Sequence, residues 1–200
     1  MKNVAIKAGA LGLVLNFLLF LLKLYIGISA NSLAIYCDAV NNLGDSLACV
    51  VALSGFWLMR RLGEKQSLRA QSLCTFIISL LIAVTGFFFI YHGTERLMYP
   101  TPVSYLVKYA VLLAVTIAVK LLMGWMFRAF RQKEDSSVLR ALELDCYLDC
   151  FVTAAALMSL VLNDLVRFAV DGTFAIIAGG IITVSAIKNL VHESKYLINN

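Results

Sequence analysis

The sequence predicts an all-α membrane protein, a bundle of six transmembrane helices, and three observations lead to this fold class. Hydrophobic residues make up 61% of the 200 positions and charged residues only 14%. The mean hydropathy is +0.86, which excludes an ordinary soluble domain. Apolar stretches long enough to cross a bilayer recur along the chain, and Lys and Arg gather in the segments on one side of them.

The first span is expected at about 8–29, after a short basic start, with Lys23 near its far end, where a long side chain can reach the membrane interface. A cleaved signal peptide would open in the same way. The apolar run, however, has the length of a span and leads directly into the next one, so we expect this helix to be retained. The second span is expected at about 32–59 and is followed by Arg60 and Arg61.

The remaining spans are expected at about 70–91, 105–127, 141–162 and 168–187. A basic connector is predicted at 62–69, a helix end and a proline-punctuated loop after His92, and a polar turn at 163–164. Lys120 lies inside the fourth span and is expected either to reach the interface or to pair with Glu143. Asp171 is interpreted as a residue at the start of the sixth helix. Together these elements predict a single transmembrane domain over 1–200.

The basic residues predict the orientation. If the N-terminus is cytoplasmic, twelve Lys and Arg residues lie on the cytoplasmic side, and three, Arg96, Lys108 and Arg167, lie outside. This asymmetry is typical of the positive-inside rule, so we expect both termini in the cytoplasm. The protein is expected to be an integral, multi-pass protein of a bacterial-type plasma (inner) membrane.

The second span carries a polar stripe that an apolar helix does not need. Asp38, Asn41, Asn42 and Asp45 share one face of this helix at helical spacing. A carboxylate near the bilayer centre costs roughly 2.5 to 3.5 kcal/mol, so it persists where it faces a partner, a cavity or an ion. The stripe therefore predicts a functional face.

A second acidic pair lies in the fifth span, where Asp145 and Asp149 are four residues apart. If the two faces meet, Asn41 (or Asn42), Asp45, Asp145 and Asp149 form an oxygen-rich cage, which by ligand type is a site for a divalent cation. Unneutralised carboxylates repel one another and need protons or a cation. Helix packing through interhelical hydrogen bonds is the alternative interpretation.

The stretch from Ser32 to Ser46 resembles the second-helix signature of the cation diffusion facilitator family. In that family an Asp-Ala pair is followed by a ligand, three residues and an Asp, and a matching pair lies on the fifth helix. The resemblance implies Asn41 with Asp45, and Asp145 with Asp149, as metal ligands. Asp38 and Asn42 are assigned to a secondary metal or proton path, and Asp38 could equally form a hydrogen bond to a neighbouring helix.

An amide and three carboxylates suit Mn²⁺, with Fe²⁺ and Zn²⁺ possible, and neither His92 nor His192 lies in the two motifs. The resemblance likewise implies a manganese-type member. A thiolate from Cys37, Cys146 or Cys150 could soften the site, but buried structural thiols are the simpler interpretation. No permanently bound cofactor is expected, because the metal is cargo.

Metal and protons compete for the same oxygens, so the sequence predicts an antiporter that exports metal in exchange for protons, and not an enzyme. The family usually carries a soluble C-terminal metal-binding domain after the sixth span. Here only 191–200 follow, so a member lacking that domain is predicted. The resemblance also implies a homodimer in the lipid bilayer, and no nucleic-acid partner is expected. A nontransporting membrane scaffold is the alternative from a different class.

Overall fold

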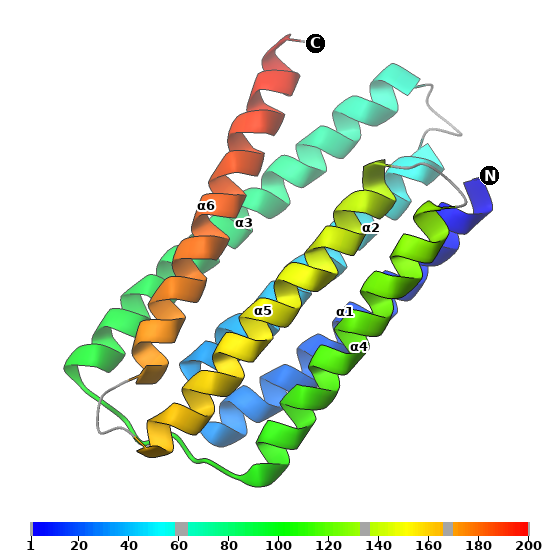
Figure 1. Cartoon of the computed structure of the whole chain (residues 1–200). Coiled ribbons are helices and arrows are strands. Elements are labelled where there is room, and N and C mark those ends of the chain that lie inside the picture. The colour runs from blue at the N-terminus through cyan, green and yellow to red at the C-terminus, as the bar shows by residue number, and fades with distance from the viewer. Residues whose placement is uncertain (1, 59–63, 133–136, 166–169, 200) are drawn as a thin grey trace.

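The computed structural model describes the chain except for residues 1, 59–63, 133–136, 166–169 and 200, and every element in the described part is an α-helix. The helices are α1 (Lys2–Ala30), α2 (Leu33–Leu58), α3 (Glu64–Met98), α4 (Val107–Arg131), α5 (Ser137–Leu165) and α6 (Val170–Asn199). The predicted all-α fold class is confirmed. Both ends of the chain lie at the same end of the bundle (Figure 1).

Several helices are longer than the predicted spans. Residues 64–69 belong to α3 and are not a connector, α3 continues past His92 to Met98, and 163–164 lie inside α5. The prediction counted only apolar residues, whereas a helix can continue beyond the hydrocarbon core with polar side chains, since its backbone hydrogen bonds are made within the helix.

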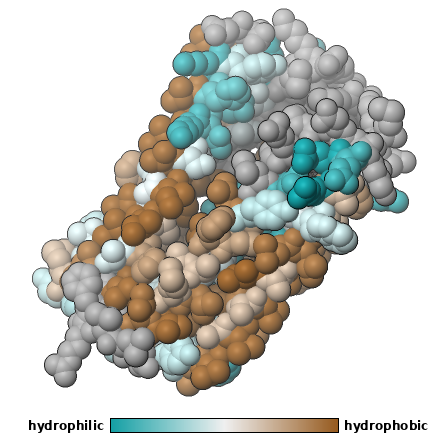
Figure 2. All heavy atoms as spheres, in the orientation of Figure 1, coloured by the Kyte–Doolittle hydropathy of each residue, from teal (hydrophilic) through white to brown (hydrophobic). Residues whose placement is uncertain are grey.

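Five described segments are long and apolar enough to cross a membrane, and they belong to α1, α3, α4, α5 and α6. The remaining helix, α2, has sufficient length, but its polar stripe lowers its hydropathy. Large apolar side chains point outward along the helices, among them Trp125 and Phe151, which are 69% and 75% exposed. Figure 2 shows apolar residues over the middle of the visible face and hydrophilic ones near the ends of α4 and α6. This surface suits lipid.

The helices fall into a group of four and a pair. Figure 1 shows α1, α2, α4 and α5 side by side, with α3 and α6 running together along them. A buried cluster that includes Ile26, Ile35, Leu113 and Leu160 joins the four helices of the group. The pair contacts the group through α2 and α5. The acidic residues of the candidate site lie on α2 and α5, the two helices of the group that contact the pair.

Close helix packing holds the pair together. Gly86 and Gly93 on α3 face Gly179 and Gly172 on α6. A Cβ atom added at Gly172 would lie 2.8 Å from the Gly93 carbonyl oxygen, and one added at Gly179 would lie 2.8 Å from the Gly86 carbonyl oxygen. Only glycine permits backbones to approach this closely, as is common between membrane helices.

Neighbouring glycines on α6 give a matched pair of substitutions. Gly179→Ala is expected to lower the free energy of unfolding by about 1 to 3 kcal/mol, because the new methyl group forces the two backbones apart. Gly180→Ala is expected to raise it by up to about 1 kcal/mol, since nothing lies within 4 Å of a Cβ atom there. Unfolding of the two variants in the same detergent measures both. Equal effects would contradict the packing described here.

At the end of the bundle opposite the termini, Asp171 joins α6 to α2. The prediction placed Asp171 at a helix start, and it does lie in the first turn of α6. Its carboxylate, however, accepts hydrogen bonds from the Ser32 hydroxyl at 2.5 Å and the Leu33 backbone N–H at 2.7 Å, so it caps α2. The Arg96 guanidinium of α3 lies 3.4 Å from the same carboxylate. One acidic side chain thus ties three helix ends together.

Candidate metal centre

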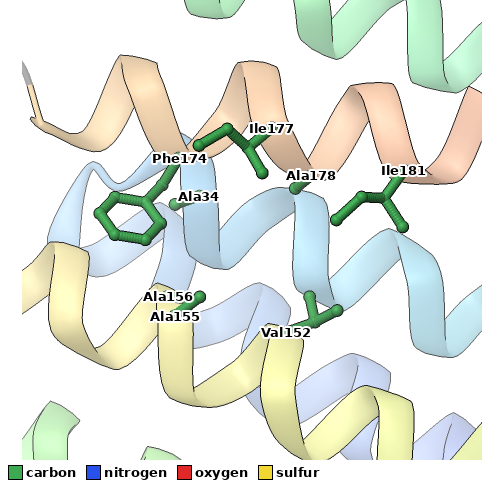
Figure 3. A pocket seen from close by; sticks show the side chains of 8 residues that line it. All are labelled: Ala34, Val152, Ala155, Ala156, Phe174, Ile177, Ala178 and Ile181. Carbon is green, nitrogen blue, oxygen red and sulfur yellow. The ribbon is translucent and has the colours of Figure 1, made fainter.

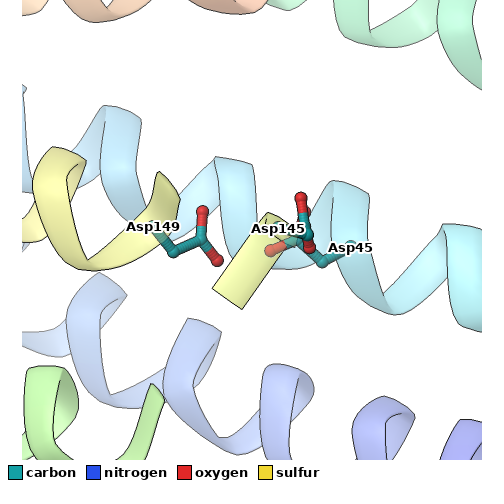
Figure 4. A group of neighbouring side chains, drawn as sticks. All are labelled: Asp45, Asp145 and Asp149. Atoms are coloured by element: carbon teal, nitrogen blue, oxygen red, sulfur yellow. The ribbon is translucent and has the colours of Figure 1, made fainter. Parts of the chain in front are cut away.

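Three carboxylates from two helices meet inside the bundle. Asp45 comes from α2, and Asp145 and Asp149 come from successive turns of α5. One oxygen of each lies within 4.8 Å of the others, and Figure 4 shows the three side chains gathered between the two helices. Asp149 is buried, whereas Asp45 and Asp145 are partly buried. We call these three residues the carboxylate cage.

Asn41 also reaches the cage. Its side-chain amide nitrogen donates a hydrogen bond of 2.6 Å to Asp149 Oδ1. All four residues of the predicted primary site therefore lie together. The amide oxygen could face the cage instead after a half-turn of the terminal amide group, because the two orientations have nearly the same shape. Asn41 can thus act as a hydrogen-bond donor without a cation and as an oxygen ligand with one.

The lysine of the fourth span occupies a position that the sequence prediction missed. Lys120 was expected at the interface or beside Glu143, and both expectations are wrong. Its side chain is completely buried, and Nζ donates hydrogen bonds to Asp45 Oδ2, at 3.2 Å, and to Asp149 Oδ2. Glu143 instead pairs with Arg131, at 2.8 Å. Desolvated carboxylates attract the nearest cation that a side chain can supply.

A second buried ion pair lies next to the cage. Lys23 of α1 was also expected at the interface, but it is completely buried and donates hydrogen bonds to Asp38 Oδ1, at 2.9 Å, and to the Thr153 hydroxyl, at 2.7 Å. The Thr153 hydroxyl in turn donates to the Asp149 backbone carbonyl, at 2.8 Å. Lys23, Asp38 and Thr153 therefore connect three helices directly beside the carboxylate cage.

The residues predicted for a secondary path take structural partners. Asp38 pairs with Lys23, and the Asn42 amide nitrogen donates to the Asp38 backbone carbonyl at 2.9 Å. One side-chain oxygen of each, Asp38 Oδ2 and Asn42 Oδ1, is buried without a hydrogen-bond partner. A buried oxygen of this kind is costly unless water or an ion satisfies it.

A cavity of about 200 Å³, lined by both polar and apolar side chains, reaches the cage from the α3 and α6 side. Asn41, Asp45 and Asp145 line it, together with Ser79 of α3 and Asn189 of α6. A second pocket, of about 40 Å³, lies between α2, α5 and α6, and its lining side chains are all apolar (Figure 3). Carbon-lined walls cannot replace the water around a cation, so of these two the cavity at the cage suits an ion and the apolar pocket does not.

Among the described side chains, thiols and histidines are not part of the cage. The cysteines whose side chains the structure describes are free thiols, and Cys37, Cys49 and Cys146 are buried. The acidic cluster in the described residues consists of aspartates alone, and His92 pairs with Glu95 at 2.9 Å on α3. Oxygen is therefore the ligand atom that this centre offers, which favours the harder divalent cations.

Five described apolar helices long enough to span a bilayer define an integral, multi-pass membrane protein, and the acidic cage inside the bundle is its candidate cation site. Residues 10–198 match the cation efflux transmembrane domain, and the chain belongs to this family. It is also 29% identical over 109 residues to the cation-efflux pump FieF of Shewanella oneidensis. That alignment covers 54% of this chain and 37% of the relative, so it spans little more than a third of the relative's length.

Proposed function

We propose that this protein is a secondary active transporter that exports a divalent metal cation, with Mn²⁺ as the first choice, from the cytoplasm in exchange for protons. The observation that carries the proposal is the meeting of Asp45, Asp145 and Asp149 between two membrane helices. Membership of the cation efflux family supports the same class of function. Asn41 completes the proposed ligand set.

The donor atoms support the choice of metal. Carboxylate and amide oxygens suit Mn²⁺, whereas zinc sites more commonly include nitrogen or sulfur ligands. Fe²⁺ and Zn²⁺ remain the alternative cargoes within the same function, because both also bind carboxylates. Comparison of the metals in one assay is therefore part of the test.

Proton exchange follows from the chemistry of carboxylates. Metal binding requires ionised oxygens and releases any protons they hold, whereas reprotonation weakens the hold on the metal. Alternating exposure of the cage to the two sides of the membrane would couple metal export to proton entry. Asp38 and Asn42, with their unpartnered oxygens, are proposed as a secondary metal or proton path.

The cavity supports access from the side of the chain termini. It extends along α6 from Ile182 to Asn189, a distance of about 10 Å at 1.5 Å per residue, toward the end of the helix that carries the C-terminus. The excess of Lys and Arg on this side supports a cytoplasmic position for this end. The structure would then correspond to a form that receives metal from the cytoplasm. A homodimer is proposed as the assembly.

A nontransporting scaffold is the second candidate, and the position of Lys120 favours it. An ammonium that pairs with Asp45 and Asp149 already holds α2, α4 and α5 together without any metal. Thermal unfolding of the detergent-solubilised protein distinguishes the two candidates. If the site binds Mn²⁺, the stability of the folded protein rises with the logarithm of the Mn²⁺ concentration once that concentration exceeds the Kd. The stability of a scaffold does not change when Mn²⁺ is added.

Uptake into inverted membrane vesicles tests the proposal directly. Mn²⁺, Zn²⁺, Fe²⁺ and Cd²⁺ are compared side by side under an imposed pH gradient, acidic inside. We expect Mn²⁺ uptake to be the largest and to fall to the level of empty vesicles when an ionophore collapses the gradient. Uptake that does not respond to the gradient would reject proton exchange, and no uptake of any metal would reject the transporter.

A further inference from the structure

Lys120 lies in the candidate metal centre, but the proposed exchange of metal for protons gives it no role. It extends from α4 into the cage and is completely buried. Its two hydrogen bonds in the described structure go to Asp45 Oδ2 and Asp149 Oδ2. Lys120 therefore lies between two of the three candidate ligands. A cation bound in the cage would need the same two oxygens that now accept hydrogen bonds from this lysine.

Charge explains why the ammonium lies there. Three carboxylates close together in a desolvated setting repel one another, and one ammonium reduces their formal charge to −2. Asn41 adds a neutral donor to Asp149. The cage without metal is therefore held by the protein's own cation and does not depend on protons alone.

A metal ion and this ammonium cannot share the cage. Two cations held by the same oxygens repel strongly where little water screens them, because the Coulomb energy rises as the distance and the dielectric constant fall. Both would also compete for Asp45 Oδ2 and Asp149 Oδ2. The lysine stem has four carbons and several rotatable bonds, so the ammonium can change its position more readily than a ligand fixed to the backbone.

We propose that Lys120 is a tethered counter-ion that occupies the carboxylate cage in the metal-free protein and is displaced when the divalent cation binds. This inference rests on the proposed function of the same site. The displacement lowers the affinity for metal, since each binding event must break the ion pairs of Lys120. It also assists release, because the returning ammonium competes with the departing ion. Lys120 is thus a positioning and affinity-setting residue and not a metal ligand.

The test compares Mn²⁺ binding to the purified full chain and to Lys120→Met, which keeps the length of the side chain and removes the charge. We expect the Kd for Mn²⁺, measured by titration calorimetry, to fall at least tenfold in Lys120→Met. The melting temperature without metal should fall, and the rise on adding Mn²⁺ should exceed that of the wild type. Mn²⁺ uptake per transporter should decrease, because release becomes slower.

Lys108→Met is the matched control, because this lysine lies on the same helix with an exposed side chain. It should leave the Kd and both melting temperatures unchanged. A merely structural lysine would show a different pattern in Lys120→Met, in which stability falls and metal binding weakens with it. A Kd that is unchanged or larger in Lys120→Met would overturn the inference.

Asp45→Asn separates failure of the inference from failure of the proposed function. If this variant loses Mn²⁺ binding while Lys120→Met does not bind more tightly, the metal site stands and the counter-ion inference is wrong. If neither the wild type nor Lys120→Met binds any divalent metal, the proposed function fails and the inference with it. Should Lys120→Met be unstable, Lys120→Gln purified in Mn²⁺ replaces it, and unfolding on chelation supports the inference. If neither variant folds even with Mn²⁺, the ammonium is required beside the metal and displacement is rejected.

Discussion

Asp45→Ala and Asp149→Ala are each expected to reduce metal-dependent transport in vesicles by about 100-fold or more. Loss of a partner in the outer shell of a metal site commonly costs 10- to 100-fold, and removal of a direct ligand is expected to cost at least as much. Each variant also removes one of the two carboxylates that hold Lys120. The initial rate of Mn²⁺ uptake per unit of reconstituted protein is the measurement.

Glu143→Ala is the matched control for this experiment. Glu143 lies on α5 only two residues before Asp145, but its carboxylate pairs with Arg131 and not with the cage. Its removal should change uptake less than about twofold, as expected for a partly exposed ion pair. Size-exclusion chromatography checks that the variants remain folded. Folded Asp45→Ala and Asp149→Ala proteins with undiminished uptake would refute the site.

Lys23→Met is expected to destabilise the folded protein by about 3 to 5 kcal/mol, because it leaves the buried Asp38 carboxylate without its cation. Both side chains are completely buried and their charged atoms lie 2.9 Å apart. The Thr153 hydroxyl would lose its donor as well. The free energy of unfolding in a denaturant titration, carried out in one detergent without metal, measures the effect.

The double variant Lys23→Met/Asp38→Asn provides the internal control, since it removes both charges together. It should recover at least half of the stability that Lys23→Met loses, because no unpaired charge remains. Lys7→Met, on the same helix but exposed, should have no measurable effect. If the effects of the two buried substitutions simply add, the ion pair makes no energetic contribution and Asp38 takes its counter-charge from elsewhere.

The carboxylate residues could be predicted from the sequence because their spacing alone restricts where they lie. Asp145 and Asp149 are one helical turn apart, so they share a face in any α-helix. A carboxylate in an apolar helix must also have a partner. The acidic pair on α5 was therefore expected to face the polar stripe on α2, which includes Asp45. The family motif supplied the same pairing. Their proximity in the structure follows that expectation.

The two buried lysines were placed wrongly for a physical reason. A lysine in an apolar span has two low-cost outcomes: its side chain can extend to the interface, or it can pair with a buried acid. Local sequence does not distinguish them, because the choice depends on which helix lies opposite. Lys23 and Lys120 both took the second outcome. The available signal was the number of Asp residues within the spans of α2 and α5. Those acids needed positive charge, and the lysines inside the other spans were the residues that could supply it.

The sequence by itself determined the all-α membrane fold, the approximate positions of the helices and the acidic character of the centre, because apolar length, helical spacing and ligand type act locally. Only the tertiary structure decided which cations neutralise that centre, which helix Asp171 caps, and where the cavity reaches the cage. These features depend on contacts between helices that lie far apart in the chain. The charges in a desolvated interior are balanced between side chains of different helices, so the balance cannot be worked out from any single helix.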